Sequence, residues 1–264
     1  MVAAVALVLL AAGCSGTADD PASDPAPAAT SSAPEDPTVA LRGRCLSAIP
    51  EDAELEAPTF TGAIGGDIEA ARVGPATNDT VAVLLPQIGG LCGWGRWATA
   101  AAEEAGLTSL LVNPCGYGES TCTADEDADP LNEVAPARAL GREELGARRV
   151  VLLGASMGGS LTVIAAANGA DADAWADVSG PPAWDGVDLS PLAAELPADG
   201  LVVMAPSDGR ASFRAARSLA RASGARFVAG RSGHGWDLLV DPVSGSLTRI
   251  GRLLIEHAAG PAGA

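Results

Sequence analysis

Short apolar runs alternate with longer amphipathic segments from about residue 80 to the end of the chain, and this alternation constrains the fold most. The runs, which we expect to be strands, are residues 80–85, 109–112, 149–153, 174–178, 201–205 and 226–228. The segments expected to be helices are residues 97–105, 135–145, 160–167, 212–223 and 246–257. Continuous apolar strands that alternate with helices indicate a sheet covered on both faces. The sequence therefore predicts an α/β fold with a mostly parallel central sheet, flanked by helices on both faces.

The amino-terminal segment has the pattern of an export leader. An unbroken apolar run, Val2 to Ala12, ends at Gly13 and Cys14. It is shorter than the roughly 20 residues that span a bilayer and favours a signal-peptide core. Small residues directly before a cysteine resemble the lipobox of bacterial lipoproteins, in which the cysteine is acylated. This resemblance implies a leader at residues 1–14, lipidation of Cys14 and anchoring at the outer face of the membrane, with plain secretion as the alternative.

The rest of the chain divides by composition. Residues 15–38 consist mainly of small, polar and acidic residues with proline, and such a stretch buries too little apolar surface to fold. Residues 39–260 are predicted to form one α/β domain with little or no cap, because about twenty residues separate the expected strands 174–178 and 201–205. The net charge is −17, and no basic patch offsets it. This balance argues against binding of nucleic acid.

Four cysteines follow Cys14, and an even count in an exported protein suggests two disulfides. Three pairings are possible. Cys115 and Cys122 lie in one predicted loop, so we expect a local bridge between them, which leaves Cys45 to pair with Cys92. The spacing does not suit zinc, and no metal or other cofactor is predicted.

A nucleophile motif follows the expected strand 149–153. Gly154-Ala155-Ser156-Met157-Gly158 matches G-x-S-x-G, with an apolar strand before it and an alanine-rich helix after it. A sharp turn of this kind exposes the serine hydroxyl above the sheet, while glycines let the strand and helix approach closely. An ordinary glycine-rich turn with a capping serine is the structural alternative.

The sequence resembles the α/β-hydrolase superfamily from about Thr80 to the end, and most of all its small-lid esterases and dienelactone hydrolases. The resemblance rests on the Ser156 motif, on the loop at residues 84–90 and on the turn at residues 113–120. It implies a Ser-acid-His triad in that chain order. It also implies an oxyanion hole made by the backbone amides of Met157 and Ile88, with Gln87 able to assist.

A serine needs a base beside it, and the chain has two histidines. His234 stands in a glycine-flanked loop after the last expected strand, whereas His257 lies near the end of a helix, where histidines usually pack or cap. We therefore predict His234 as the base. Asp208, in the loop after the expected strand 201–205, is predicted to orient it.

Other acidic and aromatic residues are weaker candidates for the active site. Asp177 and Asp185 are the competing acids, while Asp237 is too near His234 in sequence. The tryptophans in or next to the expected pocket loops have two equally supported interpretations: they line an apolar site, or they pack in the core. These are Trp94, Trp97, Trp184 and Trp236, of which Trp94 and Trp236 are predicted to contact substrate with Gln87.

These residues predict a serine hydrolase that cleaves carboxylic esters or thioesters of small molecules through an acyl-enzyme. One alternative is an acyltransferase or small-amide hydrolase with the same triad. The other, of a different class, is a surface lipoprotein with an idle site that acts as a binding module, because fold does not guarantee activity. Pro86-Gln87 stands where many members of the superfamily have His-Gly, and this favours the idle site.

Overall fold

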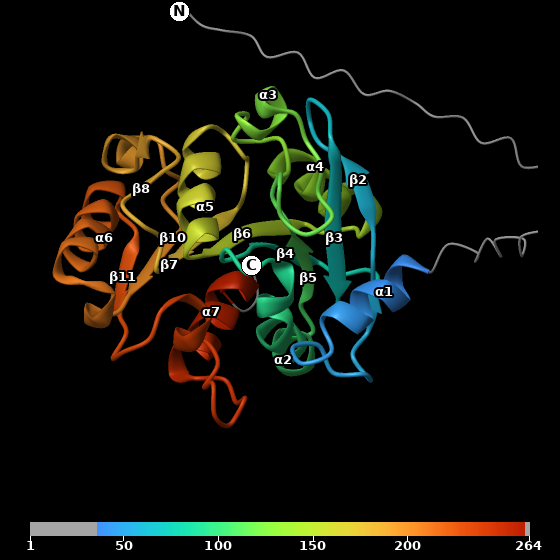
Figure 1. Cartoon of the computed structure of the whole chain (residues 1–264). Coiled ribbons are helices and arrows are strands. Elements are labelled where there is room, and N and C mark those ends of the chain that lie inside the picture. Colours follow the sequence, from blue (N-terminus) through green and yellow to red (C-terminus); the bar gives the residue numbers. More distant parts are fainter. Residues whose placement is uncertain (1–35, 262–264) are drawn as a thin grey trace, which may run out of the picture. The chain divides into compact units, whose positions relative to one another are not determined.

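The centre of the protein is a nine-stranded sheet, seen in a computed structural model that describes residues 36–261 (Figure 1). Its order is β1-β3-β5-β4-β6-β7-β10-β11, with β2 paired to β3. The strands are β1 (Leu55–Glu56), β2 (Thr59–Thr61), β3 (Asp67–Val73), β4 (Thr80–Leu85), β5 (Thr108–Val112), β6 (Arg149–Ala155), β7 (Ala174–Val178), β10 (Gly200–Met204) and β11 (Arg226–Ala229). Strands β4 to β7, β10 and β11 are parallel, and β1 to β3 form an antiparallel edge. The predicted fold class is confirmed.

Helices cover both faces of this sheet (Figure 1). They are α1 (Pro37–Arg44), α2 (Gly95–Ala105), α3 (Ala124–Asp127), α4 (Val134–Ala139), α5 (Met157–Ala167), α6 (Arg210–Ser223) and α7 (Arg249–Ala259). Side chains alternate along a strand, so Leu84 of β4 packs on the face of α1, α2 and α7, while Val83 faces α4 and α5. Helix α6 covers the same face as α5, over β10.

The amino-terminal edge was not predicted. Helix α1 begins at Pro37, two residues before the expected domain boundary, and the Asp36 side chain caps it by accepting from the Thr38 amide at 2.8 Å. The leader, Cys14 and residues 15–35 of the expected linker lie outside the described residues. Within residues 36–261 no helix is both long and apolar enough to cross a membrane.

Two disulfides join the predicted pairs. Cys45–Cys92 ties the end of α1 to the short helix η1 (Leu91–Trp94), and Cys115–Cys122 closes the loop after β5. Between β7 and β10 the chain forms only a small hairpin, β8 (Ala183–Trp184) with β9 (Val187–Asp188), and the short helix η3 (Ser190–Ala194). This agrees with the expectation of little or no cap.

Candidate active site

Ser156 stands at a sharp turn between β6 and α5. Its φ of 52° and ψ of −118° are unusual for a residue with a side chain, and the surrounding backbone holds them. The Ser156 amide donates to the Val178 carbonyl at 2.8 Å. A Cβ at Gly154 would overlap the Gly158 carbonyl, and one at Gly158 would overlap the Leu85 carbonyl. Glycine is therefore required at both positions for the strand and helix to meet this closely.

His234 and Asp208 reach Ser156 from two other loops. His234 Nε2 lies 2.7 Å from Ser156 Oγ, and its Nδ1 lies 2.9 Å from Asp208 Oδ1. Because a carboxylate can only accept, Nδ1 carries a proton and Nε2 is left to accept the serine hydroxyl. The side chain of Asp208 is 10% exposed and that of His234 is 47% exposed. The imidazole thus meets solvent on one side and a largely buried carboxylate on the other.

The loops that carry these two residues are joined to each other. Asp208 ends the short helix η4 (Pro206–Asp208) after β10, and His234 follows β11. Ser207 Oγ donates to the Gly233 carbonyl at 3.2 Å and accepts from the Gly233 amide at 3.1 Å. Sequence reasoning missed Ser207, although its place directly before the expected acid was a usable signal.

The competing residues lie elsewhere. Asp177 is fully buried on β7, where its Oδ1 accepts from the Gly180 amide at 2.7 Å. Burial raises the pKa of Asp177 to about 7, against the opposing effect of the Gly180 amide, and the charge of Asp208 adds to the rise. His257 Nε2 donates to the Trp175 carbonyl at 3.0 Å, and burial lowers its pKa. Within residues 36–261 neither side chain hydrogen-bonds to the Ser156–His234 pair.

The first loop after β4 meets the start of α5 below Ser156. The Gly158 amide donates to the Pro86 carbonyl at 2.9 Å and so joins the two segments. In the described chain, the amides of Met157 and Ile88 donate to no protein group, which leaves both available to a ligand. The Gln87 side chain lies against Gly235, beside His234, since a Cβ at Gly235 would overlap it.

The two tryptophans expected to touch substrate behave differently. Trp94 has no exposed surface, and its Nε1 donates to the Leu85 carbonyl at 2.8 Å, so the prediction that it contacts substrate is wrong. Its apolar ring packs in the core because its one polar atom finds a backbone partner there. Trp236 is half-buried, and its ring fills the space in front of Gly93.

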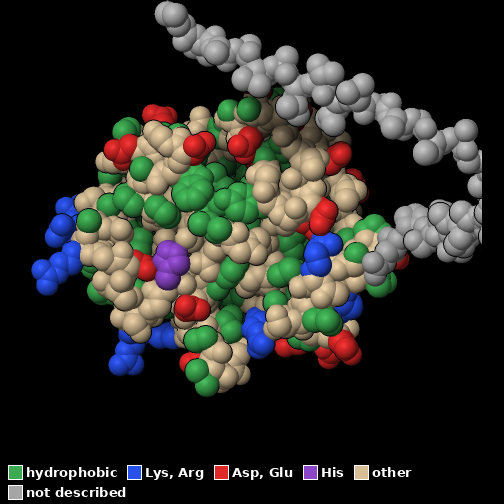
Figure 2. All heavy atoms as spheres, viewed as in Figure 1, with side chains coloured by type: hydrophobic (Ala, Val, Ile, Leu, Met, Phe, Trp, Pro, Cys, Tyr) green, Lys and Arg blue, Asp and Glu red, His purple; other side chains and the backbone are tan. Residues whose placement is uncertain are grey.

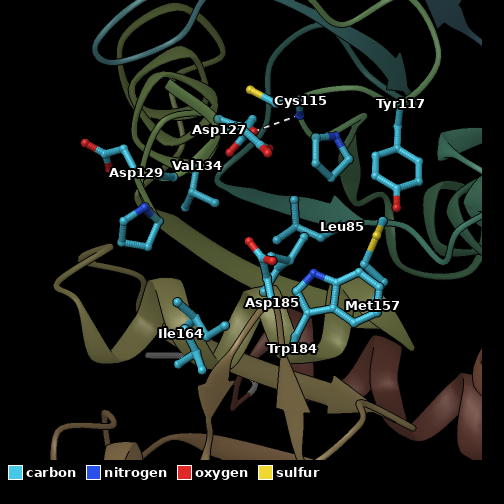
Figure 3. A pocket seen from close by; sticks show the side chains of 16 residues that line it. Leu85, Cys115, Tyr117, Asp127, Asp129, Val134, Met157, Ile164, Trp184 and Asp185 are labelled. Atoms are coloured by element: carbon cyan, nitrogen blue, oxygen red, sulfur yellow. Dashed lines mark hydrogen bonds between the residues drawn. The ribbon is translucent and has the colours of Figure 1, made fainter. Parts of the chain in front are cut away.

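A cavity of about 500 Å³ lies along α5, which lines it with Met157, Leu161 and Ile164 (Figure 3). Leu85 and Met157, the residue that follows Ser156, line it together, and Tyr117 and Trp184 contribute aromatic rings. Its carboxylates belong to Asp127, Asp129, Glu133 and Asp185. Cys115, Asp127 and Glu133 cluster as metal ligands would, but the Cys115 sulfur is held in a disulfide and is no thiolate. Asp185, one of the competing acids, lines this cavity, and the acid that contacts His234 is Asp208.

Comparison with solved structures identifies the fold. A CIB-like hydrolase from Thermoplasma acidophilum superposes with a TM-score of 0.59 at 17% identity, covering 77% of this chain and 97% of that one. An esterase from Pyrococcus furiosus gives 0.62 at 10% identity, over 79% and 94% of the chains. An enol-lactonase from Burkholderia xenovorans gives 0.61 at 18% identity, over 77% and 100%. The chain has the α/β-hydrolase fold.

The likeness to proteins of this fold is found by comparing structures and is not found by comparing sequences. No protein-family model and no curated protein sequence matches the chain. A member of the α/β serine hydrolases without a lid, from Xanthomonas campestris, superposes with a TM-score of 0.53 at 20% identity. Within the α/β-hydrolase fold the nucleophile, acid and base occur in that order along the chain, which is the order of Ser156, Asp208 and His234.

Proposed function

We propose that this protein is a serine hydrolase that cleaves carboxylic esters or thioesters, with Ser156 as nucleophile, His234 as base and Asp208 as the orienting acid. One observation carries the proposal: the 2.7 Å and 2.9 Å contacts that join these three side chains, which come from distant parts of the sequence. The hydrolases and esterases among the structural neighbours support a hydrolytic role.

In the acylation step, His234 Nε2 takes the hydroxyl proton as Ser156 Oγ attacks the carbonyl carbon. The carbonyl oxygen becomes an oxyanion, which accepts hydrogen bonds from the amides of Met157 and Ile88. Asp208 stabilises the imidazolium that forms. The imidazolium then gives its proton to the leaving alcohol or thiol, and the acyl group stays on Ser156.

In the deacylation step, water takes the place of the leaving group. His234 removes a proton from the water as its oxygen attacks the acyl carbon, and the same proton returns to Ser156 Oγ when the acid leaves. The exposed side of His234 gives this water access. Both half-reactions thus use the same base and the same pair of amides.

The test is hydrolysis of p-nitrophenyl esters of graded acyl length by the wild type, Ser156→Ala and Ser218→Ala. Ser218 is an exposed serine of α6 and serves as the matched control. We expect Ser156→Ala to lose at least about 1000-fold in kcat, and Ser218→Ala to match the wild type. Full activity in Ser156→Ala would contradict the proposal.

Membrane anchoring through Cys14 is a separate proposal that rests on the leader sequence alone. We propose that the exported protein carries acyl chains on Cys14, which would hold it at the membrane surface. Metabolic labelling with a fatty acid in a lipoprotein-processing bacterium tests this. Label should enter the wild type and be lost in Cys14→Ser, and an unlabelled, freely released wild type would favour plain secretion.

A further inference from the structure

The cavity along α5, which is lined by Met157 directly after Ser156, carries charge of one sign. Asp127 and Asp129 stand on one side of it, and Asp185 stands on the other, with Trp184 next to it (Figure 3). No arginine lines the cavity, and none of these carboxylates forms an ion pair within residues 36–261. By contrast, Asp171 and Asp173, just beyond α5, each pair with an arginine. The cavity therefore presents uncompensated negative charge.

Figure 2 shows the same asymmetry on the molecular surface. Acidic side chains lie along the upper rim of an apolar hollow, while the basic side chains drawn on this face lie farther away. A concave, partly apolar wall strengthens the field of such charges, because less water lies between them and a bound ligand.

Local structure holds Asp185 in place. The residue occupies the first of two turn positions in the β8–β9 hairpin, with a φ of 45°, and Gly186 follows with a φ of 78°. Two consecutive positive φ values define the tight turn that Asp-Gly favours. The hairpin packs against α5, and its turn therefore places Asp185 at the cavity.

Glu133 has a different role from the other carboxylates. Its Oε1 accepts from the Cys115 amide at 2.8 Å, and burial raises its pKa, with the charges of Asp127 and Asp129 adding to the rise. Glu133 therefore supports the loop after β5. Asp129 Oδ1 accepts from the Leu131 amide at 2.8 Å. The carboxylates of Asp127 and Asp185 have no protein hydrogen-bond partner in the described residues, which leaves these two groups free for a ligand.

Aromatic rings complete the cavity. Tyr117 and Trp184 are half-buried, and both rings border the space in front of Met157. Aromatic faces attract organic cations, most strongly where water is excluded, and carboxylates around the same space add to that attraction. A substrate with a free carboxylate would meet repulsion here instead.

We propose that this cavity binds an organic cation, so that the enzyme's substrate is an ester or thioester that bears an ammonium group. The inference rests on the proposed function, because the scissile carbonyl must lie at Ser156 while the cationic group occupies the cavity beyond Met157. It assigns Asp127 and Asp185 as specificity-determining residues, with Tyr117 and Trp184 as the aromatic walls.

The test compares acetylthiocholine with its neutral isostere, S-(3,3-dimethylbutyl) thioacetate, by thiol release. The wild type should hydrolyse the cationic thioester with a kcat/KM roughly 10-fold or more above that of the isostere. In Asp127→Asn/Asp185→Asn this preference should fall to about 1–2-fold, with little change for the isostere. Asp125→Asn removes the same charge from α3 outside the cavity and should keep the wild-type preference.

Failure of this inference differs from failure of the proposed function. If the wild type cleaves both thioesters equally and Ser156→Ala cleaves neither, the proposed hydrolase function stands and the cation-binding site is overturned. If neither is cleaved, calorimetric binding decides the matter. Phenyltrimethylammonium should then bind the wild type at least about 5-fold more tightly than it binds Asp127→Asn/Asp185→Asn, and equal affinity would overturn the site.

Discussion

The two sides of Ser156 are built in opposite ways. On one side, the loops of His234 and Asp208 are joined by hydrogen bonds to each other and to the serine. On the other side, the carboxylates of Asp127 and Asp185 have no hydrogen-bond or ion-pair partner within the described residues. The first side is fixed by the fold before any ligand arrives, whereas the second lacks its counter-charge. We infer that chemistry belongs to the first side and selection of the substrate to the second.

After loss of the nucleophile, the largest effect should come from Asp208, the proposed acid. Asp208→Asn places an amide beside His234 Nδ1 and disfavours the tautomer that leaves Nε2 free to accept the serine proton. We expect kcat for ester hydrolysis to fall by roughly 10⁴-fold with the fold intact. Steady-state kinetics on a p-nitrophenyl ester measures this.

Asp237→Asn is the matched control, because Asp237 is an exposed acid in the same loop as His234. It should keep activity near the wild-type value. A large loss in this variant together with a small one in Asp208→Asn would reverse the assignment of the acid.

A smaller effect should come from Ser207, the residue that joins the two loops. Ser207→Ala removes two hydrogen bonds to Gly233, so we expect a fall in kcat of about 3- to 10-fold and a loss of about 1 kcal/mol in unfolding free energy. The KM should change little, since Ser207 lies outside the cavity lining.

Ser207→Thr keeps the hydroxyl and should restore most of the kcat lost in Ser207→Ala. If both variants lose activity equally, the hydroxyl does not position the triad, and the two sides of Ser156 would differ less than we infer.

The smallest effect on catalysis, but a distinct one on stability, should come from Asp177. Its pKa is about 7 when folded and near 3.8 when unfolded, so the unfolded chain releases this proton more readily and stability declines as pH rises between those values. Asp177→Asn removes that contribution. The drop in unfolding free energy from pH 5 to pH 8 should be about 2 to 3 kcal/mol smaller in the variant, as measured by urea unfolding. An unchanged drop would mean that Asp177 is ionised in the folded protein throughout.

Much of the parallel sheet could be predicted because its strands are buried on both faces and therefore read as continuous apolar runs. Strand β4 has the predicted bounds, Thr80–Leu85, and β7 has Ala174–Val178. The meeting of Ser156, Asp208 and His234 was also predictable, since the carboxyl ends of parallel strands lie at one edge of the sheet.

The antiparallel edge escaped prediction for a physical reason. Strands β1 and β2 are two and three residues long and partly exposed, so they carry little apolar pattern. Trp94 was misplaced because sequence gives no sign of whether an indole nitrogen will find a partner in the core, as this one does at Leu85. The acidic cavity was missed because Asp127 and Asp185 are far apart in sequence and each, taken alone, is typical of a solvated loop.

The most direct test of the account is labelling with a fluorophosphonate probe, followed by peptide mapping. A hydroxyl activated by His234 attacks the phosphorus and becomes covalently labelled, whereas an ordinary surface serine does not. The account predicts one labelled peptide, modified at Ser156, and loss of that label in His234→Ala. Labelling at another serine, or no labelling of the folded wild-type protein, would contradict it.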